Sequence, residues 1–293
     1  MQKLLLALLS FAFIFTNPIH TQALSMSQYF ISSEVGPCLT SGGNSKACDP
    51  AKPEETSVLS AVENLHAEWL SISKRICSEA VIGGNFLDGN TVEFIGTNQK
   101  ISATITLRDL NLDDINSLNS FGTKATTQGN LTTTTTSTLQ DSAPKPLSLA
   151  TLPYWTENSG SNTPNSRNGI LFEFFDENKN PIEIDSFGAW FGDLETRHDV
   201  LPAFMRIYDR NGEALSENIL INEDENTDLN QCGTTSGTGK GCGNHTTRWI
   251  GFNSSDDQPT SVQKFLIVVG EDDLGADGSR EHLSFIGTTL AIS

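Results

Sequence analysis

Carboxylate side chains cluster beside apolar segments in the second half of the chain. Asp193 and Glu195 follow one apolar segment, and Asp272, Asp273 and Glu281 follow another. Like charges gathered at the ends of strands repel one another unless a cation neutralises them. Ca²⁺ binds roughly six to eight oxygen ligands, and carboxylates suit it well. The pattern therefore predicts a structural Ca²⁺ ion at these residues, and the alternative interpretation is a solvated acidic surface.

Aromatic side chains supply a second chemistry, because a flat ring with a polar edge can stack on a sugar. Tyr154 and Trp155 follow Pro153 in a polar stretch and are predicted to form an exposed pair that binds carbohydrate. Packing of these two residues against the edge of a sheet is the alternative. Trp190 and Trp249 stand within apolar strand patterns, so we expect them in the core.

No motif for nucleophilic or acid–base catalysis stands out. Neither H-E-x-x-H nor G-x-S-x-G occurs. His66 is expected to be a hydrogen-bonded or solvated helix residue, because Leu70, four positions later, cannot share a metal ion. His198 and Asp199 are neighbours in sequence, and such neighbours seldom form a catalytic dyad. We therefore predict no catalytic residue.

Cysteines are the third group that could do chemistry, and the chain has 5 of them. Cys232 and Cys242 bracket a polar loop and are the most natural disulfide pair, while Cys38 and Cys48 bracket a similar loop. Cys77 is then left over, either free or exchanging with Cys38 or Cys48. The sequence contains neither a C-x-x-C pair nor a suitably spaced histidine, so a zinc site is not expected.

The first residues predict export, which makes disulfide bonds plausible. Lys3 precedes a short apolar run, and small residues follow near Ala23. This arrangement is typical of a secretory signal peptide, here residues 1–23. The apolar run is short for a membrane span, so no transmembrane segment is expected in the mature chain. The alternative is that the run is not cleaved and serves as an N-terminal anchor. We expect a secreted or cell-surface protein.

Charge excludes some partners. The formal net charge is −18, from 18 Lys and Arg against 36 Asp and Glu. Such an excess argues against nucleic acid and against an anionic membrane as partners. It fits either cation-binding loops or an extracellular protein kept soluble by its charge.

The elements that must position these groups are short strands. Residues 169–293 alternate aromatic and β-branched runs with acidic, Gly-rich breaks, which is typical of an antiparallel β-sandwich. Residues 91–95 and 101–107 predict a hairpin, and Asn111 is placed to cap a short helical turn at 112–118. The runs in the second half are GILFEFF, SFGAWFGD, AFMRIYDRNG, TTRWIGF, VQKFLIVVGEDD and HLSFIGTTLAI.

One amphipathic helix is predicted at residues 56–77, where apolar residues recur at spacings of three and four. Residues 123–150 are rich in Thr, Ser and Pro, and are interpreted as a long loop inside one domain, with a glycosylated spacer between two modules as the alternative. The expected organisation is a signal peptide at 1–23, a loop-rich leader plus helix at 24–78, and a β-sandwich domain at 79–293 that contains the insertion.

The C-terminal part is similar to a known family. SFGAWFGDLETR, MRIYDRNGEAL, TTRWIGF, FLIVVGEDDLG and EHLSFIGTTLA resemble the jelly-roll-like β-sandwich domains of bacterial exported and surface proteins, including the PEP-CTERM-type modules. The segment GTTLAIS does not resemble the sorting tail of that type. Glu281 and His282 stand where an Asp-Asp or Asp-Asn would be expected. The resemblance implies a mainly β, jelly-roll-like fold and little about chemistry.

Together these observations predict an exported, non-catalytic β-sandwich protein that binds a partner outside the cell, with carbohydrate as the expected ligand class and Ca²⁺ as a structural ion. An extracellular glycan hydrolase with carboxylates at one end of the sandwich is the first alternative. A structural envelope or matrix component that associates through sheet edges is the second.

Overall fold

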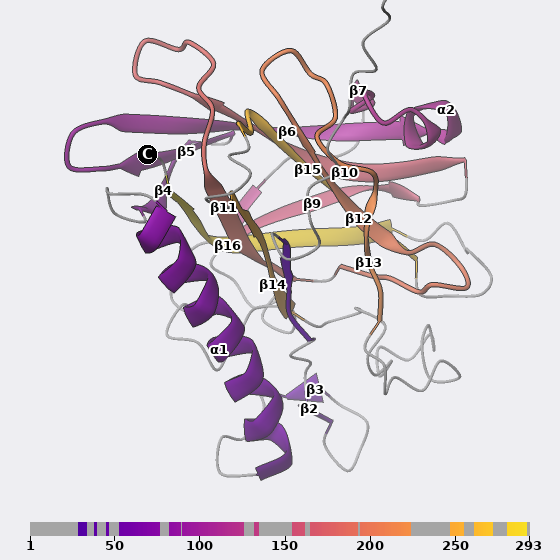
Figure 1. The fold of residues 1–293 in the computed structure, drawn as a ribbon. Coiled ribbons are helices and arrows are strands. Elements are labelled where there is room, and N and C mark those ends of the chain that lie inside the picture. Colours follow the sequence, from indigo (N-terminus) through magenta and orange to yellow (C-terminus); the bar gives the residue numbers. More distant parts are fainter. Residues whose placement is uncertain are drawn as a thin grey trace, which may run out of the picture.

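Antiparallel strands make up most of the chain that the computed structural model describes (Figure 1). The protein is mainly β, as the sequence predicts. Two helices, α1 and α2, accompany the strands within this part of the chain. The residues described are 29–33, 38–39, 45–46, 53–76, 82–88, 90–125, 132–134, 154–161, 165–192, 194–223, 247–254, 261–271 and 280–291.

The first sheet, called sheet I, contains the first and the last of the described residues, Tyr29 and Ala291. Its strands follow the order β1-β14-β11-β16-β9-β8. Strand β1 pairs with β14, which lies more than two hundred positions later, so the leader segment contributes an edge to this sheet. The strands are β1 (Tyr29–Ile31), β8 (Thr132–Thr134), β9 (Tyr154–Ser161), β11 (Ser186–Gly192), β14 (Thr247–Asn253) and β16 (Arg280–Ala291).

The second sheet, sheet II, follows the order β5-β6-β10-β15-β12-β13, and β7 adds to the end of β6. The predicted hairpin is confirmed here, because β5 and β6 pair with Ile95 opposite Lys100. The strands are β5 (Thr91–Ile95), β6 (Lys100–Asn111), β7 (Thr123–Lys124), β10 (Ser166–Phe175), β12 (Ala203–Tyr208), β13 (Ile219–Ile221) and β15 (Lys264–Val268).

Strand β4 (Ile82–Asp88) connects the two sheets. Its start pairs with β16 of sheet I, where Gly83 lies opposite Thr289. Its remainder pairs with β5 of sheet II, beginning with Gly84 opposite Phe94. The two sheets are therefore joined at one edge by a single strand. A separate two-stranded ribbon is formed by β2 (Cys38–Leu39) and β3 (Ser45–Lys46).

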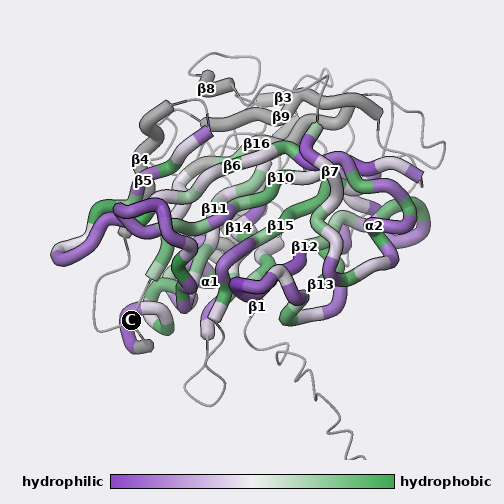
Figure 2. Tube along the Cα trace, turned by 90° about the horizontal axis from the view of Figure 1, so that it is seen from above, coloured by the Kyte–Doolittle hydropathy of each residue, from purple (hydrophilic) through white to green (hydrophobic). Residues whose placement is uncertain are grey.

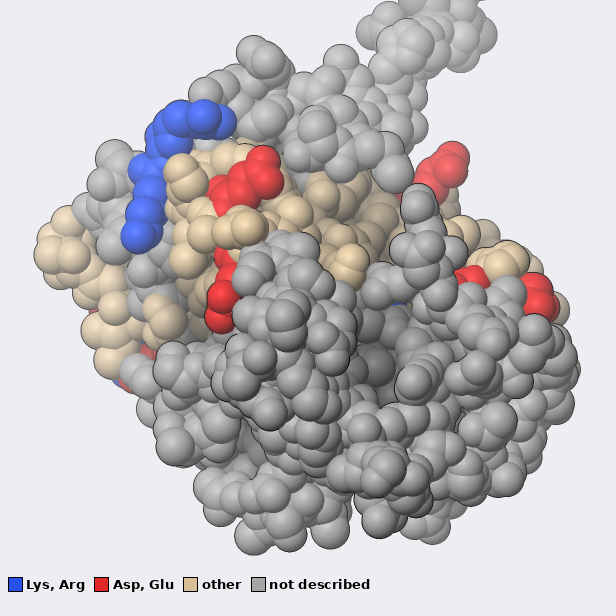
Figure 3. All heavy atoms as spheres, turned by 90° about the horizontal axis from the view of Figure 1, so that it is seen from below, with Lys and Arg blue, Asp and Glu red and all other residues tan. Residues whose placement is uncertain are grey.

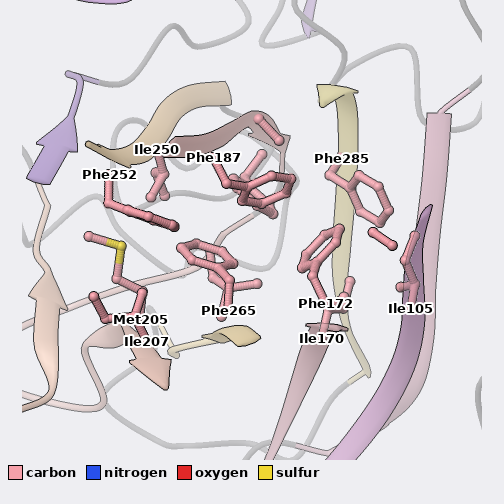
Figure 4. Close-up of a cluster of buried hydrophobic side chains, with 14 of the residues drawn as sticks. Ile105, Ile170, Phe172, Phe187, Met205, Ile207, Ile250, Phe252, Phe265 and Phe285 are labelled. Atoms are coloured by element: carbon pink, nitrogen blue, oxygen red, sulfur yellow. The ribbon is translucent and has the colours of Figure 1, made fainter. Parts of the chain in front are cut away.

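An aromatic core fills the space between the sheets (Figure 4). The ring centroid of Phe172 in β10 lies 5.0 Å from that of Phe187 in β11 and 5.0 Å from that of Phe285 in β16. Phe265 of β15 lies 5.2 Å from Phe187. All four side chains are at most 1% exposed. Facing strands thus meet through alternate aromatic residues, because successive side chains of a strand point to opposite faces.

Hydropathy along the chain agrees with this arrangement. Figure 2 shows hydrophobic residues recurring along the central strands, whereas several peripheral connections are hydrophilic. Strand β10 is apolar on both faces, as predicted for a central strand. Its Phe172 enters the core between the sheets, and its Leu171 belongs to a second cluster with Leu266 and Tyr208.

Helix α1 (Pro53–Ile76) lies against the other face of sheet I, beside β14. Trp69 is fully buried there and donates its indole N–H to the carbonyl oxygen of Phe252 at 3.0 Å. Ser73 donates to the side-chain oxygen of Asn253 at 2.7 Å. Of the helices among the described residues, none has the length and apolar character to cross a membrane.

His66 of α1 lies among three tryptophans. Its ring centroid is 4.1 Å from that of Trp249, 5.3 Å from that of Trp190 and 6.5 Å from that of Trp69. Among the described residues, no group bonds to its buried Nε2 atom. Burial lowers the pKa of His66 to about 4. The tryptophan surface of sheet I therefore covers part of the ring, and His66 keeps some exposure to solvent.

Helix α2 (Leu112–Asn116) covers part of sheet II and is capped as predicted. Asn111 accepts from the backbone N–H of Asp114 at 2.9 Å, and the Asp114 carboxylate accepts from the backbone N–H of Asn111 at 3.0 Å. The fully buried Arg206 of β12 donates to the carbonyl oxygens of Ser117 and Ser120 at 3.0 and 2.9 Å. This guanidinium therefore holds the segment after α2 on the sheet.

Candidate functional site

The candidate site lies at one end of both sheets, which we call the rim. Strand β11 ends there at Gly192, β13 at Ile221 and β15 at Val268, while β12 begins there at Ala203. The two sheets are in contact at this end, because Arg248 of β14 donates to the carbonyl oxygen of Asn222, which follows β13, at 2.9 Å.

A loop at residues 194–202, the rim loop, connects β11 to β12. The backbone N–H of Gly270 donates to the carbonyl oxygen of Glu195, and that of Glu271 donates to the carbonyl oxygen of Leu201, both at 2.8 Å. Thr196 donates its hydroxyl to the carbonyl oxygen of Ile221 and accepts from the backbone N–H of Ala203. The rim loop is therefore fixed to both β13 and the end of β15.

A glycine makes this close contact possible. A Cβ atom on Gly270 would lie 2.3 Å from the carbonyl oxygen of Glu195 and 2.4 Å from that of Leu201. Contacts below about 3 Å between such atoms are repulsive. Only glycine therefore lets the end of β15 lie this close to the rim loop.

Two charge pairs occupy the tip of the rim loop. Arg197 donates through Nε and Nη2 to the two carboxylate oxygens of Asp199, at 2.5 and 3.1 Å. His198 contacts Glu223 through Nδ1, and its backbone N–H donates to the same carboxylate at 2.9 Å. Arg197 and Glu223 are only 6% and 7% exposed, whereas Asp199 and His198 are 38% and 57% exposed. Each exposed group is thus held by a buried one.

The electrostatics of the two carboxylates follow from these partners. The hydrogen bond from Arg197 holds the pKa of Asp199 below its ordinary value. Burial alone would raise the pKa of Glu223, but the hydrogen bonds from His198 outweigh burial and lower it. Both carboxylates are therefore anionic at neutral pH. In the tautomer with a proton on Nδ1, the imidazole donates a hydrogen bond to Glu223 and its exposed Nε2 atom is an acceptor.

The sequence did not reveal these pairs. His198 and Asp199 do not pair with each other, as expected for sequence neighbours, but each pairs with another residue. Glu223 stands in an acidic stretch after Ile219–Ile221, and nothing in that stretch indicates a histidine partner. No sequence pattern indicated the ion pair of Arg197 with Asp199, because that pair depends on the local turn of the rim loop.

The predicted metal-binding residues are only partly described. Glu195 lies in the rim loop and is 7% exposed. Asp193, Asp272 and Asp273 lie outside the described residues. Glu281 lies in β16, and its side chain is outside them as well. The backbone bond between Gly270 and Glu195 brings together two of the predicted acidic segments.

Within the described part of the chain, no three His, Cys, Asp or Glu side chains are grouped closely enough to hold a metal ion. On the face drawn in Figure 3, the described Asp and Glu side chains stand in separate groups rather than in one continuous patch.

The predicted sugar-binding aromatics lie in β9. Tyr154 is the register partner of Thr134, and Trp155 is the partner of Thr133 and of Phe285, which is buried in the core. The polar stretch after Pro153 is thus a strand of sheet I. The side chains of Tyr154 and Trp155 lie outside the described residues, so both the exposed pair and its alternative stay predictions. Trp190 and Trp249 are 1% and 0% exposed, which confirms the prediction that they belong to the core.

The predicted disulfides also lie mostly outside the described residues. Cys38 is in β2 opposite Lys46, two positions before Cys48. Cys48, Cys77, Cys232 and Cys242 are not described, so both disulfide bonds stay predictions.

Comparison with known proteins adds little to this geometry. No protein-family model matches the chain, and no curated protein matches it. The crystal structure of the enzymatically active domain of bacteriophage CBA120 tailspike protein 4 resembles it with a TM-score of 0.33 and 12% identity. The likeness covers 64% of this chain and 19% of the tailspike chain. At this TM-score it establishes no common fold, and no activity is transferred from it.

Proposed function

We propose that this chain is an exported, non-catalytic protein that binds glycan outside the cell or at the cell surface. The two facing sheets form a jelly-roll-like β-sandwich, whose role is to hold loops at its ends. The signal-like residues 1–23 and the net charge of −18 support an extracellular location.

The observation that carries the proposal is the rim loop. Its backbone is bonded to two strands, and its exposed side chains are held by buried partners. Polar groups fixed in this way lose little conformational freedom when a ligand binds. Sugars present many hydroxyl groups to such donors and acceptors. The core between the sheets is filled by aromatic residues at most 1% exposed, so a ligand must meet the outside of the fold.

Tyr154 and Trp155 are proposed as a second contact, because β9 runs toward the same rim. In β16, Ser284 is the partner of Gly192, the last residue of β11 at the rim. The last residue of β9, Ser161, pairs with Arg280, which lies four positions further toward the rim along β16. A ligand longer than one sugar could extend from the rim loop along this strand.

The proposal includes a structural Ca²⁺ ion at the rim. Asp193 and Glu195 flank the start of the rim loop, and Asp272 and Asp273 follow the segment bonded to it. A Ca²⁺ ion bound by oxygen ligands from these two segments and from Glu281 would offset the repulsion between their negative charges.

A glycan array with the purified protein tests the proposal. Binding to one class of glycan is expected, with loss of the signal in Trp155→Ala and no change in Glu177→Gln, an exposed residue at the opposite end of the fold. No binding to any glycan would refute it. Release of reducing sugar from polysaccharides would show instead that the protein is a hydrolase, and polymers on size exclusion would favour a matrix role.

A further inference from the structure

We infer that His198 and Asp199 contact the glycan directly and select neutral sugars that carry two adjacent free hydroxyl groups. This inference rests on the proposed glycan-binding function and names the residues and the sugar chemistry. The two residues are neighbours at the tip of the rim loop, and both are exposed.

The orientation of both side chains is set before any ligand arrives. Glu223 accepts from both the ring and the backbone of His198, and Arg197 grips both carboxylate oxygens of Asp199. Rotation of His198 or Asp199 would leave a partner side chain that is only 6% or 7% exposed without its hydrogen bond. The tip of the rim loop is therefore a fixed polar surface.

The hydrogen-bonding character of this surface is that of an acceptor. With Nδ1 committed to Glu223, the Nε2 atom of a neutral His198 has a free lone pair. The carboxylate of Asp199 keeps lone pairs beyond those that Arg197 uses. Two acceptors on consecutive residues complement two neighbouring hydroxyl donors, which is what a vicinal diol of a sugar ring presents.

Charge argues for a neutral sugar. The positive charge of Arg197 is already paired with Asp199, and Glu223 adds a further carboxylate behind His198. An acidic sugar would bring its anion next to these carboxylates, and like charges placed together at an interface are unfavourable. The overall charge of −18 acts in the same direction.

The exposed side chains of His198 and Asp199 are not needed to hold the rim loop in place. The rim loop is already fixed by backbone bonds from Gly270 and Glu271 and by the hydroxyl of Thr196. A purely structural ion pair would not need a ring that is 57% exposed. Exposure together with fixed orientation is the property of a contact residue.

Two substitutions separate contact from support. In His198→Asn, the amide nitrogen can take the place of Nδ1 and keep the bond to Glu223, while the acceptor at Nε2 is lost. In Asp199→Asn, the side chain keeps its size but loses its charge and one acceptor. Glu177→Gln, in the turn after β10 at the opposite end, is the matched control for removal of an exposed carboxylate.

The probes are immobilised neutral polysaccharides, namely dextran, mannan and galactan, and the acidic polysaccharides alginate and polygalacturonate. Each neutral probe is also used after periodate oxidation and borohydride reduction, which destroys vicinal diols. The expected result is binding to an intact neutral probe, loss of binding after periodate treatment, and about tenfold weaker binding for each rim variant at an unchanged melting temperature. Glu177→Gln should bind like the wild type.

The outcomes distinguish this inference from the function on which it rests. If the wild type binds no polysaccharide, the proposed function itself fails. If it binds a neutral probe but both rim variants bind equally well, the function stands and the assignment of His198 and Asp199 is wrong. Binding that survives periodate treatment, or that occurs only with the acidic probes, overturns the diol selectivity.

Discussion

Gly251 in β14 lies directly against the indole nitrogen of Trp69 in α1, so that a Cβ atom at this position would be 2.9 Å from Trp69 Nε1. The same atom would lie 2.9 Å from the carbonyl oxygen of Phe187. Gly251 is the register partner of Gly188, whose own Cβ atom would lie 2.5 Å from the ring of Trp249. Two opposed glycines thus make room for the tryptophans between α1 and sheet I.

Replacement of this glycine should weaken the contact between helix and sheet. Gly251→Ala is expected to lower the free energy of unfolding by about 1–3 kcal/mol, because a backbone oxygen and a buried ring must both move. Urea denaturation measures the change. Gly83→Ala is the control, since nothing lies within 4 Å of a Cβ atom there. Equal effects of the two substitutions would contradict the role assigned to Gly251.

His66 predicts a specific pH dependence. Its ordinary pKa is 6.5, and burial lowers it to about 4, so the unfolded chain takes up the proton first as the pH falls. Its contribution to stability is complete above about pH 6.5 and is lost as the pH falls toward 4. The wild type should lose more stability than His66→Leu over this range. Parallel pH profiles for the two proteins would show that the ring is not buried.

Arg206 should be irreplaceable even by lysine. Its guanidinium reaches the carbonyl oxygens of Asp114, Ser117 and Ser120 and the side chain of Asn218. A lysine has three donors on one nitrogen and cannot span these oxygens, so Arg206→Lys should cost about 3 kcal/mol of stability. The exposed Arg210→Lys is the control, and both are measured by denaturant unfolding. A cost for Arg206→Lys no larger than that of the control would contradict this role.

The proposed Ca²⁺ ion predicts a melting temperature that depends on chelation. An ion bound only to the folded state adds about 2.7 kcal/mol of stability at a free concentration one hundred times its dissociation constant. EDTA should therefore lower the melting temperature, and excess Ca²⁺ should restore it. Asp272→Asn should abolish the difference. An identical melting temperature with and without EDTA would contradict the proposed Ca²⁺ site.

Much of the second half of the fold could be predicted from sequence. The six apolar runs correspond to β10, β11, β12, β14, β15 and β16. They were recognisable because central strands are buried and are bounded by Gly, Asp and Asn. A register shift between Gly188 and Trp190 marks a bulge in β11, where the sequence places a glycine inside a strand pattern. Asp209 stabilises its own turn by accepting from the backbone N–H of Asn211 at 2.8 Å.

Other features could not be read from the sequence because they depend on distant pairing. Strand β1 is three residues long and pairs with β14, which lies far along the chain. Strand β9 is polar and lacks an apolar alternation, so the sequence did not indicate a strand there. The bond between His198 and Glu223 joins positions 25 residues apart, and only the ends of β11 and β13 bring them together. Side-chain pairing of this kind leaves no local pattern.

Hydrogen exchange of the protein with and without a bound neutral polysaccharide measures whether the ligand lies on the rim loop. Backbone amides of the rim loop should exchange more slowly in the complex, above all at His198, whose N–H is bonded to Glu223. The turns around Asp176 and Asp209, at the opposite end of the fold, should exchange at unchanged rates. Protection confined to those turns, or an unchanged rim loop in the presence of a polysaccharide that binds, would contradict the account.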